Sequence, residues 1–212
     1  MGDLEDLEEL KLSFKRKLPP PRGSRGGLLC PVSPGILERE FVIWSDRPLF
    51  LWQANTRQTK LQKLELLQAG TLDYNAEILW EKSLSPASQN VEYDGQALQP
   101  GQNYQWQLTW NQQNQNQQWR SYKLNRQFRV MAAPERNQIA ADLQTLATQL
   151  RARKVSDEAI AIRQAKYFVD RGLLSDAFQV LYMIKNPSTE TATAVQELID
   201  SVCKLVKNLS QD

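Results

Sequence analysis

Residues 93–110, which read YDGQALQPGQNYQWQLTW, constrain the fold more than any other stretch of this chain. Asp-Gly at 94–95 and Pro-Gly at 100–101 are turn signals, because proline presets φ for a turn and glycine accepts the positive φ that follows. After the second turn, aromatic or apolar side chains alternate with polar ones as far as Trp110. A period of two is typical of a strand with one face in a core and the other in water. The stretch therefore predicts one strand of a β-sandwich, entered through a tight loop.

Further short alternating segments surround this strand. Candidate strands lie at residues 41–44, 49–53, 60–67, 78–84, 103–110 and 119–130, with a short seventh near 90–93. Short strands with turn signals at this spacing are typical of a β-sandwich. Trp52, Trp80 and Trp106 fall on apolar faces and are predicted to lie in the core. Trp119 has the opposite parity to the core residues of its segment and is predicted to point outward.

A composition break falls at residues 131–134. After it the chain has no tryptophan, and the apolar period changes from two to about 3.6, which indicates helices. Pro134 suits the first turn of one helix, and Ser156 is a natural cap for a second that ends at Gly172. A third helix is predicted over residues 174–185 and a fourth after Ser188. Four helices with short links predict a small antiparallel bundle or a solenoid fragment.

The predicted fold is therefore α+β in two segregated parts. We predict a flexible N-terminal tail over residues 1–27, an all-β sandwich over 28–131 and a helical domain over 132–212. The tail is basic between residues 11 and 25 and contains three consecutive prolines. It is either a solvated linker, which the sequence favours, or a basic arm that grips an acidic surface or RNA.

The composition argues against several classes of function. The 212 residues include no histidine, the commonest general acid or base near neutral pH and the commonest metal ligand. Lys and Arg number 26 against 24 Asp and Glu, and this net charge of +2 does not favour a dedicated nucleic-acid binder. Glu92 and Asp94 form a candidate carboxylate pair, but a turn-forming Asp beside an exposed Glu is the simpler interpretation. We therefore predict no enzyme activity, catalytic residue, metal or cofactor.

Only two cysteines occur, Cys30 and Cys203, near opposite ends of the chain. A bridge between them is one alternative, and two free thiols in a reducing compartment is the one that the sequence favours. The first ten residues are acidic, unlike a signal peptide, and no apolar run approaches the roughly 20 residues that span a membrane. We expect a cytoplasmic protein without a membrane span. Export is the alternative if the N-terminus is incomplete.

The middle of the chain resembles a fibronectin type III-like sandwich found in cyanobacterial proteins. The likeness rests on Pro-Leu-Phe-Leu-Trp at 48–52, on Leu-Trp at 79–80, and on Leu98 with Pro-Gly at 100–101 before Tyr104 and Trp106. It covers about 90 residues. The resemblance implies a structural or adhesive module without an active site to carry over.

A second resemblance is carried by residues 163–184, RQAKYFVDRGLLSDAFQVLYMI. Small Ala165 and Ala177, aromatic Phe168, turn Gly172 and apolar Leu181 are similar to one tetratricopeptide-type helical hairpin. Arrays of such repeats need about three copies to bury their faces, and this chain shows one. The hairpin is therefore expected to borrow the helices on either side of it.

Two hypotheses of function follow. The first is a non-enzymatic adaptor whose helical domain contacts another protein or a second copy of this chain, because open apolar ends of a lone repeat are normally capped or used. The alternative is a carbohydrate- or cell-wall-binding module that uses Trp110 and Trp119, which flank the amide run NQQNQNQQ. The predicted partner-binding residues of the first hypothesis are Phe178, Tyr182, Val202, Leu205, Val206 and Leu209.

Overall fold

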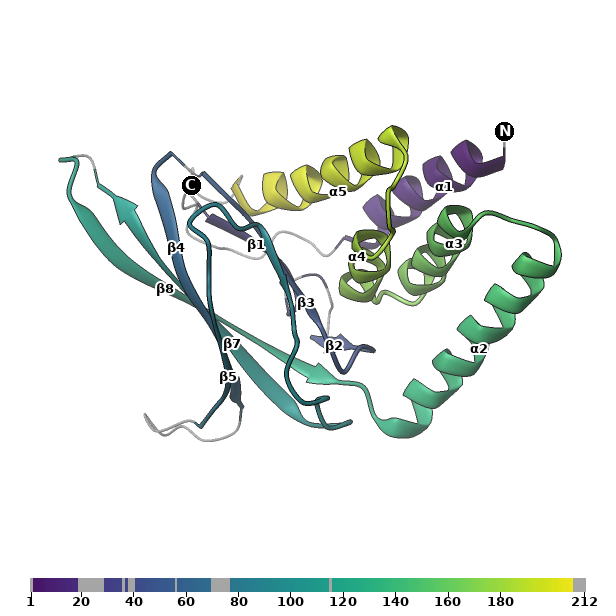
Figure 1. Ribbon diagram of the computed structural model, residues 1–212, viewed down its shortest axis with the longest axis horizontal. Helices are drawn as coiled ribbons and strands as arrows, with labels where there is room; N and C mark the ends of the chain where they lie inside the picture. The colour runs from purple at the N-terminus through teal and green to yellow at the C-terminus, as the bar shows by residue number, and fades with distance from the viewer. Residues whose placement is uncertain are drawn as a thin grey trace.

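The computed structural model describes residues 2–18, 29–35, 37, 41–55, 57–69, 77–114 and 116–207. These residues form a sheet-rich part followed by a helical part, which confirms the predicted α+β class. Figure 1 shows three layers: the helices, a small sheet beside them, and a larger sheet on the far side. The small sheet therefore has neighbours on both of its faces.

The two sheets form the sandwich. The inner sheet has the strand order β1-β3-β6, and the outer sheet has the order β2-β8-β7-β4-β5. All strand pairs are antiparallel except β2 with β8. The strands are β1 (Leu29–Ser33), β2 (Val42–Ile43), β3 (Leu49–Ala54), β4 (Thr59–Gln68), β5 (Ile78–Ser83), β6 (Asn90–Glu92), β7 (Asn103–Gln113) and β8 (Trp119–Val130).

Sequence alternation located every strand except β1. The two prolines at 31 and 34 excluded a helix there but also masked the strand, because proline cannot donate to a sheet ladder. Pro31 nevertheless pairs with Trp52 in the register of β1 and β3. The strand is short and lies at the sheet's edge, where proline is tolerated.

The helical part contains α2 (Ala133–Ala152), α3 (Asp157–Asp170), α4 (Leu174–Tyr182) and α5 (Thr189–Lys207). These helices fall where the period of 3.6 predicts them. Ser156 caps α3, since its Oγ accepts a hydrogen bond from Ala159 N at 3.1 Å. Gly172 takes a positive φ of 76° in the turn between α3 and α4.

Two hydrophobic cores lie on opposite faces of the inner sheet. One fills the sandwich and includes Phe50, Trp52 and Trp106, while the other joins Leu51 and Val32 to the helices. Alternate residues of one strand thus enter different cores, which explains why β1 and β3 are buried almost throughout. The predicted burial of Trp52 and Trp106 is confirmed, and Trp106 Nε1 donates to Pro34 O at 3.0 Å.

Trp80 is partly buried and packs against the sandwich core, as predicted. Trp119 is 42% exposed, so its predicted outward orientation is also confirmed.

The N-terminal prediction was wrong over most of its length. Residues predicted to form a flexible tail instead form a helix, α1 (Gly2–Lys17), whose side chains Leu7, Leu10 and Phe14 are buried against the other helices. An isolated helix of this length is marginal in water, and packing of its apolar stripe supplies the missing stability. Residues 19–27 of the predicted tail lie outside the described residues.

A polar junction fixes the helices to the loop between β2 and β3. Both carboxylate oxygens of the buried Asp176 accept backbone hydrogen bonds, from Trp44 N at 2.8 Å and Ser45 N at 2.9 Å. Arg136 Nε donates to Trp44 O at 2.9 Å, and Trp44 Nε1 donates to Arg136 O at 3.0 Å. Arg136 also forms an ion pair with Asp46 at 2.6 Å. These contacts set the position of α2 and α4 relative to the sandwich.

Among the described residues, no helix is both long enough and apolar enough to cross a membrane.

Candidate functional site

The candidate site is the surface of α3, α4 and α5 on which α1 lies, and we call it the docking surface. Its residues in direct contact with α1 are Arg163 and Lys166 of α3, Phe178 of α4 and Glu197 of α5. Behind them, small fully buried residues, Ala165 and Ala177, occupy facing helices of the α3–α4 hairpin. Small side chains let helices approach closely, so α3 and α4 can pack side by side beneath α1.

The apolar stripe of α1 supplies the central contacts. Leu7, Leu10 and Phe14 recur at spacings of three and four residues and therefore lie on one helix face. The rings of Phe14 and Phe178 pack edge to face, with centroids 5.1 Å apart and planes at 72°. This is a favoured geometry for two aromatic rings, in which the positive edge of one meets the negative face of the other. α1 is therefore held by this specific ring contact as well as by the apolar area that it buries.

Ion pairs surround the apolar stripe. Asp6 pairs with Arg163 at 2.8 Å, Glu9 with Lys166 at 3.3 Å, and Lys11 with Glu197 at 2.7 Å. Acidic residues of α1 thus face basic residues of α3, and a basic residue of α1 faces an acidic residue of α5. A helix bound in the reverse direction would not bring these opposite charges together, so the charge pattern favours one orientation of the helix on the surface.

The Lys11–Glu197 pair shifts both titrations. The hydrogen bond to Glu197, reinforced by one to Glu8, raises the pKa of Lys11 above its usual value. In turn, the hydrogen bond from Lys11 lowers the pKa of Glu197. On α3, the hydrogen bond to Asp170 is the main cause of a raised pKa for Lys166, and the contact with Glu9 adds to it. The raised pKa of Lys11 and of Lys166 and the lowered pKa of Glu197 all favour the charged forms near neutral pH.

α2 covers the other side of α3. Tyr167 donates its hydroxyl proton to Asp142 Oδ2 at 2.5 Å. Burial, together with this hydrogen bond, raises the pKa of Tyr167 to about 12. The side of α3 that does not face α1 therefore already has a partner.

The predicted partner-binding residues are not a free surface. Phe178 is 0% exposed and Val202 is 2% exposed, so neither is open to a partner. The prediction failed for Phe178 because it treated the N-terminal residues, which include Phe14, as a tail. Tyr182 is half-buried, and burial raises its pKa. Leu205 and Val206 belong to α5, but their side chains lie outside the described residues, as does all of Leu209.

The residues predicted for carbohydrate binding do not form one site. Trp110 is buried at 9% exposure and stacks on Tyr122 across the β7–β8 register. Trp119 pairs with Gln113, an odd number of residues from Trp110, and therefore points to the opposite face of the outer sheet. The two tryptophans flank the amide run in sequence, but only Trp119 is open to a ligand.

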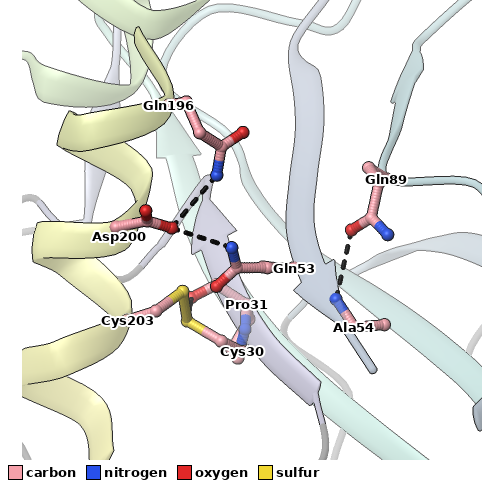
Figure 2. The surroundings of a disulfide bond; sticks show 8 residues. All are labelled: Cys30, Pro31, Gln53, Ala54, Gln89, Gln196, Asp200 and Cys203. Atoms are coloured by element: carbon pink, nitrogen blue, oxygen red, sulfur yellow. Dashed lines mark hydrogen bonds between the residues drawn. A yellow bond between two sulfur atoms is a disulfide. The ribbon is translucent and has the colours of Figure 1, made fainter. Parts of the chain in front are cut away.

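A disulfide between Cys30 of β1 and Cys203 of α5 ties the helices to the inner sheet (Figure 2). Both cysteines are buried, and their Cα atoms are 5.8 Å apart. Beside the bridge, Asp200 accepts hydrogen bonds from Gln53 Nε2 at 2.9 Å and Gln196 Nε2 at 3.0 Å. The expectation of two free thiols was therefore wrong. A separation of 173 residues leaves no local sequence signal for the pairing.

Comparison with known families agrees with the fold of the sandwich. The family described as "Rha78A-like, N-terminal immunoglobulin domain" matches residues 36–124, from just before β2 to the middle of β8. This part of the chain is similar to an immunoglobulin domain, which supports the predicted Ig- or fibronectin-like sandwich. No curated protein and no solved structure matches the chain. The match begins after α1 and ends before α2, so it does not extend to the docking surface.

Proposed function

We propose that this chain is a non-enzymatic protein-interaction module whose docking surface binds an amphipathic helix. α1 supports this directly, because it is an amphipathic helix seated on that surface with three buried apolar side chains and complementary charges. An amphipathic helix laid on an apolar surface is a common mode of peptide recognition. A partner would present the same features: apolar residues spaced three and four apart, with acidic residues beside the first two.

In this proposal α1 is the intramolecular occupant of the site. A partner's helix, or α1 of a second copy of the chain, takes its place. The α3–α4 hairpin supplies most of the surface, consistent with its resemblance to a tetratricopeptide hairpin. The fibronectin type III-like sandwich, with its likeness to cyanobacterial domains, serves as the rigid support.

A non-catalytic role also fits the carboxylates considered as acid–base candidates. Asp94 accepts hydrogen bonds from Lys82 and from Trp80 Nε1, the latter at 2.7 Å, and these lower its pKa. It is therefore an ionised structural group near neutral pH. Glu92 lies exposed on the edge strand β6. Among the described residues, no three His, Cys, Asp or Glu side chains gather as a metal site would require.

The disulfide supports a working place outside a reducing compartment. Buried structural disulfides persist in oxidising environments and are rare in the cytosol. Of the two localisations that the sequence allows, we therefore propose export over the cytoplasm. The test is the redox state of the natural protein: mass spectrometry of protein alkylated at lysis should find neither cysteine modified, whereas alkylation of both would refute the oxidised state.

Exchange of α1 tests the binding proposal. A protease site is inserted within residues 19–28, the full chain is purified and cleaved, and a fluorescent peptide of residues 1–18 is added in excess. We expect the peptide to replace α1 in the cleaved chain, seen as a rise in anisotropy, and to bind the uncleaved chain far more weakly. A peptide carrying Leu10→Asp and Phe14→Asp is the matched control and should not bind. Failure of α1 to exchange, or unfolding of the cleaved chain, would show that α1 is an inseparable part of the core.

A further inference from the structure

The outward face of the outer sheet is unusually rich in amides. Side chains of β7 and β8 that point away from the sandwich core pair across the strands as Gln105 with Gln127, Gln107 with Asn125, Asn111 with Ser121, and Gln113 with Trp119. All of them are half-buried or exposed. Asn is depleted in strands, so β-propensity does not account for this choice of residues. An amide has both hydrogen-bond donors and an acceptor, which is what a hydroxyl-rich ligand requires. Gln107, Gln113 and Gln127 each donate one hydrogen bond within the chain, to Glu65, Gln117 O and Gln105, so the remaining amide groups are the ones that a ligand can use.

Trp119 provides an aromatic surface at one end of this face. It is 42% exposed, and the Lys60 ammonium lies 4.5 Å from its ring centroid. Lys60 pairs with Asn111 in the neighbouring strand, so the cation, the indole and the amides belong to one continuous surface. The ammonium covers one face of the indole, so a sugar ring would stack on the face that Lys60 does not cover.

The charges on this face do not cancel. Lys63 bridges Glu65 at 2.7 Å and Glu81 at 2.9 Å, and Gln107 donates to Glu65 at 2.7 Å, so both carboxylates are already engaged. Lys60 and Lys123, by contrast, have no ion-pair partner among the described residues. The net charge of this face is therefore positive, and these two lysines lie next to the amide side chains.

Thr109 lies on the same face, paired in register with Lys63 on one side and Lys123 on the other. Its side chain is more than nine-tenths buried, and its Oγ1 makes no hydrogen bond to any described residue. The oxygen has almost no accessible surface, so it takes no part in the binding surface, which consists of the more exposed residues around it.

We propose that this face binds an acidic polysaccharide. A sugar ring stacks on Trp119, the amides of β7 and β8 bind its hydroxyls, and Lys60 and Lys123 bind its carboxylate or sulfate groups. The proposal goes beyond helix recognition, because the face lies on the side of the sandwich remote from the helices (Figure 1). Single-stranded nucleic acid also carries anionic groups, but its binding surfaces usually stack successive bases on several aromatic rings. Trp119 is the single exposed aromatic among the outward residues of β7 and β8.

Calorimetric titration of the full oxidised chain tests this with three probes: an oligogalacturonate for carboxylated sugars, a dextran sulfate for sulfated ones, and a neutral dextran. We expect binding to at least one acidic probe and none to the neutral dextran. Trp119→Ala should weaken binding about tenfold, the effect of losing one stacked ring. The double variant Lys60→Gln/Lys123→Gln should abolish the preference for acidic probes.

Tyr122→Ala is the matched control, because Tyr122 belongs to the same strand and is 39% exposed, but points to the opposite face. It should leave the affinity unchanged. Circular dichroism checks that each variant is folded. Absence of binding to both acidic probes would overturn the proposal, and so would equal binding by Trp119→Ala. An oligonucleotide of mixed sequence that bound more tightly than either acidic probe would reassign the face to nucleic acid.

Discussion

The helices α1 and α5 share one hydrophobic core with the α3–α4 hairpin, yet they are attached in different ways. α5 is covalently joined to β1 through the Cys30–Cys203 disulfide, and Asp200 adds a hydrogen bond to Gln53 of β3. α1 has no covalent tie of that kind and is held by Leu7, Leu10 and Phe14 with three ion pairs. Both helices bury an apolar stripe in the same core.

This difference in attachment supports the proposal that α5 stays in place while α1 can be replaced. A disulfide across 173 residues keeps α5 in position even when its packing fluctuates. The contacts of α1 are those of a bound peptide: a short apolar stripe framed by exposed or partly exposed charges. The comparison is the reason for proposing α1, and not α5, as the part of the core that leaves while the rest stays folded.

Loss of the disulfide should have the largest effect on stability. Closing so long a loop restricts the unfolded chain, and Cys203→Ser should lower the free energy of unfolding by about 5 kcal/mol. Urea unfolding followed by tryptophan fluorescence measures this, because five of the six tryptophans lie in strands of the sandwich. Reductant should bring the wild type to the same midpoint and leave the variant unchanged. If the wild type and Cys203→Ser had the same midpoint without reductant, the disulfide would not stabilise the fold, and it could not explain why α5 is held more firmly than α1.

Two phenylalanine variants, one in α4 and one in α1, test whether the two sides of the same contact contribute differently to stability. Phe178→Ala opens a cavity in the permanent part of the core and should cost about 3 to 5 kcal/mol in urea unfolding. Phe14→Ala removes the ring that faces it, and each ring is fully buried. Since we propose that α1 leaves on its own, this variant should release α1 while lowering the stability of the sandwich by less than about 1 kcal/mol. Equal losses for the two variants would mean that α1 unfolds only with the whole molecule.

Acid should release α1 before it unfolds the sandwich. Lys11 holds the pKa of Glu197 below its usual value. A carboxylate with a lowered pKa in the folded state stabilises that state above its unfolded pKa, and this contribution disappears as the pH falls through the folded pKa. Affinity of the cleaved chain for the peptide of residues 1–18 should therefore fall below about pH 4.3. Glu197→Gln should reduce this acid dependence, whereas Glu190→Gln, at an exposed position of the same helix, should preserve it.

The smallest effect is expected from the outermost ion pair. Glu9 is mostly exposed and lies 3.3 Å from Lys166, which already pairs with Asp170 at 2.8 Å. Exposed pairs contribute at most about 1 kcal/mol, so Glu9→Gln should change the affinity of the peptide for the cleaved chain less than about fivefold. Asp6→Asn, which breaks the shorter pair with Arg163, should have the larger effect of the two. The reverse order would show that contact distance does not rank these pairs.

Local sequence patterns predict most of the elements of this fold. Alternation found the long strands, and the period of 3.6 found α2 to α5, because each pattern is set by residues close together in the chain. Sequence could not show that the inner sheet is buried on both faces, since Phe50 enters one core and Leu51 the other. That arrangement depends on helices that follow more than 80 residues later.

The candidate site depends even more on distant contacts. Leu4, Leu7 and Leu10 are three residues apart, which is a weak helical pattern, and so short a helix is marginal in water unless it packs against a partner. Phe14 continues the same apolar stripe, and the basic residues of α3 are complementary to the acidic residues of this segment. Both observations strengthen the helical pattern of the N-terminal segment. The predicted residue Phe178 does belong to an apolar surface. The prediction that this surface is open to a partner was wrong, because the N-terminal helix of the same chain covers Phe178.

Native-state hydrogen exchange of the full oxidised chain tests the central claim most directly. Amides of α1 and α5 are compared at increasing, sub-denaturing concentrations of urea. We predict that α1 opens at a clearly lower free energy than α5 and the sandwich strands, with little dependence on urea, as expected for release of one helix. Exchange of α1 at the same free energy as β7 and α5, with the urea dependence of global unfolding, would contradict the claim that α1 is an exchangeable occupant.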